Sequence, residues 1–141
     1  MKNYTTLAIS VLSLIVLSAC GAPPSNSDAA LEEAAATVDA FMNFTLGSLP
    51  GSNLDFDRAN TLLTPSYEAE FIMPMSYCIQ DGPSDVQITS TTFNDQQNWA
   101  IVTVEGAYYG GWRKLWDFTV VPTEGDHWMI NKIECSPEML Q

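Results

Sequence analysis

Few side chains in this sequence have the chemistry of a catalytic or metal-binding group: the 141 residues contain one histidine and three cysteines. His127 directly follows Asp126, and two neighbours in a turn do not have the geometry of a catalytic triad. Cys78 and His127 together would make a thiol nucleophile with its base, provided that the thiol is free. Acidic pairs such as Asp55 and Asp57 lack the ligand spacing of a zinc or calcium site. We therefore predict no catalytic residue, no metal and no cofactor.

Cys20 stands at the end of an apolar N-terminal segment. Lys2 is followed by an uncharged apolar run at residues 7–17, which is shorter than the about 20 residues of a transmembrane helix. A positive charge, a short apolar run and then small residues are typical of a secretory signal peptide. The letters LSAC at residues 17–20 resemble a bacterial lipobox. The resemblance implies transfer of diacylglycerol to the Cys20 thiol, cleavage before Cys20 and acylation of the new amino terminus, with palmitate among the attached lipids. The alternatives are an ordinary signal peptide with an unrelated cysteine, or a buried core segment.

The lipobox resemblance divides the chain into a signal peptide at 1–19, a lipidated cysteine with a flexible tether at 20–27, and a folded domain at 28–141. The tether is polar and contains proline and serine, a composition that favours an unfolded linker. Two or more acyl chains hold a protein stably on a membrane. We therefore expect a protein anchored by lipid in the bacterial cell envelope. Gly21 resembles the residue that allows transport to the outer membrane, facing the periplasm, in a Gram-negative cell.

The charge of the chain limits its partners. Seventeen acidic residues and five basic ones give a formal net charge of −12. Nucleic-acid binding depends on basic side chains that displace counterions from phosphates, so we predict no nucleic-acid partner. An anionic membrane surface would repel the chain because both are negatively charged. The N-terminal lipid is therefore its expected contact with the membrane.

The first half of the chain has helical spacing. Apolar residues three and four apart predict a helix over 28–49, with Gly47 and Pro50 as stop signals. A shorter helix is predicted within 54–63, and a third over 65–71 because a proline there suits a first helical position.

Beyond Pro74 the pattern alternates with the period of a strand. Short turns between the strands indicate an antiparallel meander. The last strand needs a bulge near Asn131 and Lys132, because Ile133 would otherwise point away from the face that carries Ile130. Together the elements predict an α+β domain, with N-terminal helices packed on a curved antiparallel four-stranded sheet. The strands are expected at 86–93, 99–108, 112–121 and 127–135.

This order of elements resembles the NTF2-like (cystatin-like cone) superfamily, and in particular small bacterial lipoproteins that carry such a domain. The resemblance covers nearly all of residues 28–135. Its most telling feature is the last strand, where a glycine turn precedes Trp128, Ile130 and Ile133. Residues 50–53 form an insertion between the first two predicted helices and depart from the family pattern. The departure bears on where these helices end and begin, and not on the fold class.

The resemblance implies a pocket between the helices and the concave face of the sheet. Enzymes of the superfamily, such as isomerases and dehydratases, need a carboxylate base in that pocket. By strand parity Asp117 and His127 lie opposite to the neighbouring core residues and are expected to face solvent. We therefore expect a non-catalytic binding or accessory domain for an envelope partner protein or a small apolar ligand; the alternative is an isomerase or dehydratase using the pocket. The candidate pocket residues are Phe41, Tyr67, Tyr108, Trp116 and Trp128.

Aromatic residues gather around the turn between the second and third strands. Tyrosine and tryptophan are enriched in protein interfaces, and the adjacent cations Arg113 and Lys114 occur in the same turn. The hairpin is therefore a candidate binding patch, while the alternative is a set of core and ordinary exposed rings. The patch residues are Tyr108, Tyr109, Trp112, Arg113 and Trp116.

Cys78 and Cys135 remain in the folded part. An even pair of cysteines outside the cytoplasm usually closes a disulfide bond. In the chain-entropy model such a bond would stabilise the fold by about 4 kcal/mol. The alternative is two unpaired buried thiols, and only unpaired Cys78 would have the thiol that a nucleophile needs.

Overall fold

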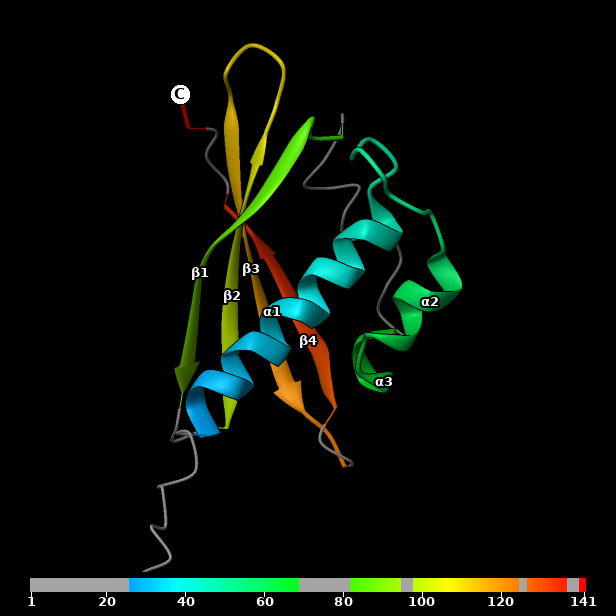
Figure 1. The fold of residues 1–141 in the computed structure, drawn as a ribbon, viewed down its shortest axis with the longest axis vertical. Coiled ribbons are helices and arrows are strands. Elements are labelled where there is room, and N and C mark those ends of the chain that lie inside the picture. Colours follow the sequence, from blue (N-terminus) through cyan, green and yellow to red (C-terminus); the bar gives the residue numbers. More distant parts are fainter. Residues whose placement is uncertain (1–25, 69–81, 95–97, 125–126, 137–139) are drawn as a thin grey trace, which may run out of the picture.

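In the computed structural model of the chain, the described residues are 26–68, 82–94, 98–124, 127–136 and 140–141. Three helices precede four strands (Figure 1), which is the element order of the predicted α+β class. The helices are α1 (Asn26–Thr45), α2 (Phe56–Thr61) and α3 (Pro65–Glu68). The strands are β1 (Asp85–Asn94), β2 (Trp99–Ala107), β3 (Arg113–Pro122) and β4 (Trp128–Cys135).

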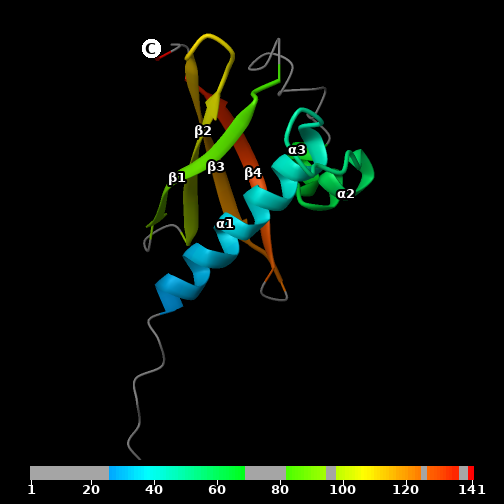
Figure 2. The same ribbon diagram turned by 45° about the horizontal axis from the view of Figure 1, so that its top comes forward.

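The four strands form one sheet in the order β1-β2-β3-β4, and every neighbouring pair is antiparallel. The predicted meander is therefore confirmed. In Figures 1 and 2, α1 crosses one face of this sheet. The short helices α2 and α3 lie near the C-terminal end of α1. None of the helices in the described ranges is long and apolar enough to cross a membrane.

A bulge in β4 confirms the prediction near Asn131 and Lys132. Thr119 pairs with Lys132 while the next residue of β3, Val120, pairs with Ile130, so Asn131 is the extra residue. The bulge keeps Ile130 and Ile133 on the face that packs on the core.

A second bulge, in β1, was not predicted. Ile88 pairs with Val104 and Ser90 with Thr103, which leaves Thr89 as the extra residue. Ile88 and Phe93, on either side of this bulge, consequently both pack against the core.

The core lies between α1 and the sheet. The ring of Phe41 in α1 meets the ring of Phe118 in β3 edge to face, with centroids 6.1 Å apart at 68°. Both side chains are fully buried. The other buried apolar residues are Ala34, Val38, Met42, Leu46, Leu49, Ala59, Leu63, Ala100, Val102, Val104, Trp116, Val120 and Ile130.

The ends of the helices differ from the prediction. α1 ends at Thr45 and not at residue 49, although Leu46 and Leu49 are buried. These two leucines extend the apolar spacing, but the chain there turns, with Leu49 N donating to Leu46 O at 3.3 Å. α2 begins at Phe56 because the Asp55 side chain accepts a hydrogen bond from Arg58 N at 3.0 Å, which is an N-cap.

A short segment after α2 joins the helices to the sheet edge. Leu63 forms a parallel bridge with Ile130, supported by Ile130 N donating to Leu62 O at 2.7 Å and Thr64 N donating to Ile130 O at 2.9 Å. This pairing places the end of α2 beside β4, where the pocket described below is found.

Cys135 is disulfide-bonded. Cys20 and Cys78 lie outside the described residues, so the Cys78–Cys135 pairing and the lipid anchor stay predictions, as do the boundaries at 1–19 and 20–27.

Candidate functional site

The β2–β3 hairpin turns through two glycines. Gly110 and Gly111 have φ angles of 87° and 82°, which glycine adopts without the steric cost of a side chain. The turn is closed by Tyr108 N donating to Trp112 O at 2.8 Å and Gly111 N donating to Tyr108 O at 3.3 Å. Tyr109 lies at the tip of this hydrogen-bonded turn, and 89% of its surface is exposed.

Trp112 lies on the same turn and is 39% exposed. A Cβ atom added at Gly110 would lie 3.4 Å from Trp112 Cδ1, so the indole lies close to this glycine. Trp112 therefore presents a partly exposed indole ring beside the glycine turn.

The C-terminal end of the chain adds one more apolar side chain to this region. Arg113 and Leu140 exchange two backbone hydrogen bonds of 2.8 Å, and Figure 1 shows the C-terminus beside the hairpin. Leu140 is 41% exposed. We call Tyr109, Trp112, Arg113 and Leu140 the hairpin patch.

The two cations of the hairpin point to opposite faces. Adjacent residues of a strand alternate, and Lys114 pairs with buried Gly106, whereas Arg113 Nη1 lies 3.4 Å from Glu105 Oε1. The sequence places these cations together, but only Arg113 belongs to the hairpin patch.

Two predicted patch residues are not part of an exposed surface. Trp116 is 1% exposed and belongs to the core, because it faces α1 from the centre of the sheet. Tyr108 is half-buried and packs against the same core. Within the described part of the chain, the buried atoms Tyr108 Oη and Trp116 Nε1 have no hydrogen-bond partner. Burial raises the pKa of the Tyr108 phenol, so this hydroxyl stays protonated at neutral pH.

The predicted pocket between the helices and the sheet stays a prediction. Phe41 and Trp116 are buried core side chains between α1 and the sheet. Tyr67 and Tyr108 are half-buried against this core. One of the five predicted residues, Trp128, lines a pocket that described residues form.

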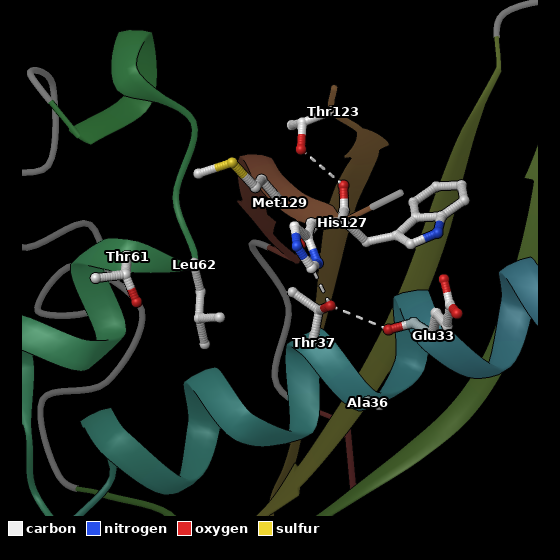
Figure 3. Close-up of a pocket in the computed structure, with 9 residues that line it drawn as sticks. Glu33, Ala36, Thr37, Thr61, Leu62, Thr123, His127 and Met129 are labelled. Atoms are coloured by element: carbon white, nitrogen blue, oxygen red, sulfur yellow. Dashed lines mark hydrogen bonds between the residues drawn. The ribbon is translucent and has the colours of Figure 1, made fainter. Parts of the chain in front are cut away.

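That pocket lies at the other end of the sheet, between α1, the end of α2 and the β3–β4 turn (Figure 3). Its volume is about 440 Å³, within the range of small-molecule sites. Of its lining residues, only Trp128 was predicted from the sequence as a pocket residue, because the walls come from three separate segments without a shared motif. The lining residues are Glu33, Ala36, Thr37, Thr61, Leu62, Thr123, His127, Trp128 and Met129.

The candidate acid and base residues lie at the surface. Asp117 is exposed and accepts a hydrogen bond of 2.7 Å from Thr103 Oγ1, and His127 is exposed, as strand parity predicted. Among the side chains whose burial is described, no Asp, Glu or His is buried, and the buried polar residue is Thr64. The described ranges contain no cluster of His, Cys, Asp and Glu that could hold a metal ion.

Comparison with known protein families, curated proteins and solved structures found no match for this chain. The fold and the site geometry define a helix-on-sheet α+β domain. An exposed aromatic hairpin lies at one end of the sheet and a shallow pocket at the other.

Proposed function

We propose that the chain is a lipid-anchored protein of the bacterial cell envelope, and that its domain, of the NTF2-like class, docks a partner protein through the hairpin patch without catalysing a reaction. The letters LSAC at 17–20 support the anchor. The order of helices and antiparallel strands supports the class of domain.

The observation that carries docking is the exposure of Tyr109 on a turn that its own hydrogen bonds hold closed. Large aromatic side chains lose little conformational entropy on binding, and a preformed turn lowers the ordering cost further. Trp112 adds exposed apolar surface on the same turn, and the paired residues Arg113 and Leu140 add a cation and a further exposed apolar side chain at this end of the sheet. Tyr, Trp and Arg are the residues that most often dominate interface energies.

The isomerase or dehydratase alternative has less support. It requires a carboxyl group inside the domain, and the acidic side chains whose burial is described lie at or near the surface. A small apolar ligand would need space between α1 and the sheet, which Phe41, Trp116 and Phe118 occupy.

Anchoring is tested by Cys20→Ser. We expect this variant to accumulate as an unprocessed precursor that takes up no labelled palmitate, because serine has no thiol to accept diacylglycerol. Gel mobility and palmitate labelling in bacterial cells measure both effects, with Cys78→Ser as the matched control that retains Cys20. Processing and lipid labelling of Cys20→Ser at the wild-type level would contradict the anchor.

Docking is tested by Tyr109→Ser and Trp112→Ala. Truncation of an interface hot spot commonly costs about 2 kcal/mol, or about thirtyfold in affinity, so recovery of the envelope partner should fall strongly while the circular dichroism spectrum stays unchanged. Phe56→Ser is the matched control, because Phe56 is 55% exposed but lies in α2, away from the hairpin. Unchanged recovery with an intact fold would contradict docking through this patch.

A further inference from the structure

Hydrogen bonds between separate segments hold together the walls of the pocket in Figure 3. Thr37 Oγ1, on α1, lies 3.4 Å from the carbonyl oxygen of Trp128 on β4. Ile130 N donates to Leu62 O at 2.7 Å and joins β4 to the residue that follows α2. The three walls therefore belong to one packed unit, and the pocket is preformed.

The hydroxyl groups of the pocket can only accept further hydrogen bonds. Thr37 Oγ1 donates to Glu33 O at 3.0 Å, and Thr61 Oγ1 donates to Arg58 O at 2.7 Å. Thr123 Oγ1 donates to His127 O at 2.9 Å. A hydroxyl has one proton and two lone pairs, so each of these threonines keeps only acceptor capacity for a ligand.

The charge of the pocket also favours a ligand that donates hydrogen bonds and carries a positive charge. Glu33 is exposed at the pocket, and its carboxylate takes no part in the ion pairs found within the described ranges. The field of a chain with a net charge of −12 concentrates cations near such a group.

Apolar side chains line the rest of the space. Leu62, Trp128 and Met129 are half-buried there, and in Figure 3 the imidazole of His127 lies between Met129 and Thr37. An indole ring attracts a cation through its π face. The pocket therefore offers acceptors, a carboxylate and an aromatic ring together with a surface for an apolar body.

We propose that this pocket binds a small organic amine, with its ammonium group at the Glu33 carboxylate and its apolar body against Leu62, Trp128 and Met129, while the threonine oxygens offer further acceptors along the wall. The site is separate from the hairpin patch, and its occupation does not depend on docking. The same ammonium chemistry is carried by a free amine and by a lysine side chain of another protein, and the experiment distinguishes the two.

The test is titration of the purified full chain at pH 7.5 with three probes of similar apolar body: phenethylamine, 2-phenylethanol and 3-phenylpropanoate. NMR signals of the Trp128 indole N–H report the dissociation constants. We expect phenethylamine to bind at least threefold more tightly than the alcohol, and the carboxylate to bind most weakly. Glu33→Gln should weaken phenethylamine about fivefold, the upper end for an exposed ion pair.

The matched control is Glu32→Gln, which removes the same charge from the neighbouring exposed residue of α1 that does not line the pocket. Equal binding of the amine and the alcohol, or equal weakening by Glu32→Gln and Glu33→Gln, would overturn the proposal. N-acetyl-lysine methylamide identifies the source: tighter binding than phenethylamine assigns the ammonium to a lysine side chain, and weaker binding assigns it to a free amine. Either order supports the ammonium site.

Discussion

Phe118→Ala is expected to lower the free energy of unfolding by about 4 kcal/mol, within the about 3–5 kcal/mol typical of Phe→Ala in a core. Phe118 is fully buried in the third strand, where its Cα partners are Val102 and Ile133, and its ring meets Phe41. Alanine would leave a cavity among side chains that already fill the space between α1 and the sheet. Urea denaturation followed by circular dichroism measures the loss.

Thr119→Ala is the control for this prediction. Thr119 follows Phe118 in the same strand and points to the opposite face, where it is only half-buried. Its truncation should lower the free energy of unfolding by less than about 1 kcal/mol, because the strand propensities of different residues span about that range. Equal losses for the two variants would show that the core does not lie on the α1 side of the sheet.

Gly106→Val is expected to cost about 3 kcal/mol of unfolding free energy, because it overpacks the core beside Trp116. A Cβ at Gly106 would clash with Trp116 Cη2 and lie 2.6 Å from Cζ3, with Pro83 Cβ at 3.3 Å behind it. The indole is enclosed, with 1% of its surface exposed, so it has no free space into which to move.

A double-mutant cycle separates this clash from a general effect of valine. In a Trp116→Leu background the added side chain has room, so Gly106→Val should cost at least about 1 kcal/mol less than in the wild type. Ala107→Val, one residue later on the opposite face, should stay within about 0.5 kcal/mol. Equal costs of Gly106→Val in both backgrounds would contradict contact between Gly106 and Trp116.

Most of the fold could be predicted because each element has one apolar face. The bulge at Asn131 was visible because Ile130 and Ile133 are large apolar residues out of phase with each other. The bulge at Thr89 was hidden, since serine and threonine fill residues 89–92 and fit either face of a strand. α1 was predicted too long because burial of Leu49 continues the helical spacing through a turn.

The sites were less predictable because they depend on contacts between distant segments. Tyr108 and Tyr109 are neighbours of the same type, and the turn geometry alone decides that only Tyr109 is exposed. Leu140 joins the hairpin patch through backbone pairing with Arg113, which leaves no local pattern in the sequence. Glu33 and His127 are 94 positions apart, and only the packing of α1 on the start of β4 brings them to one pocket.

Docking through the hairpin patch is tested most directly by photo-crosslinking in living cells. Benzoylphenylalanine replaces Tyr109 in one strain and Phe56 in another, so that both probes occupy exposed aromatic positions of the same domain. We predict that the probe at position 109 crosslinks to one defined envelope protein, that Trp112→Ala abolishes this product, and that the probe at position 56 does not form it. The absence of a crosslink from position 109, or the same product from both positions, would contradict docking through this patch.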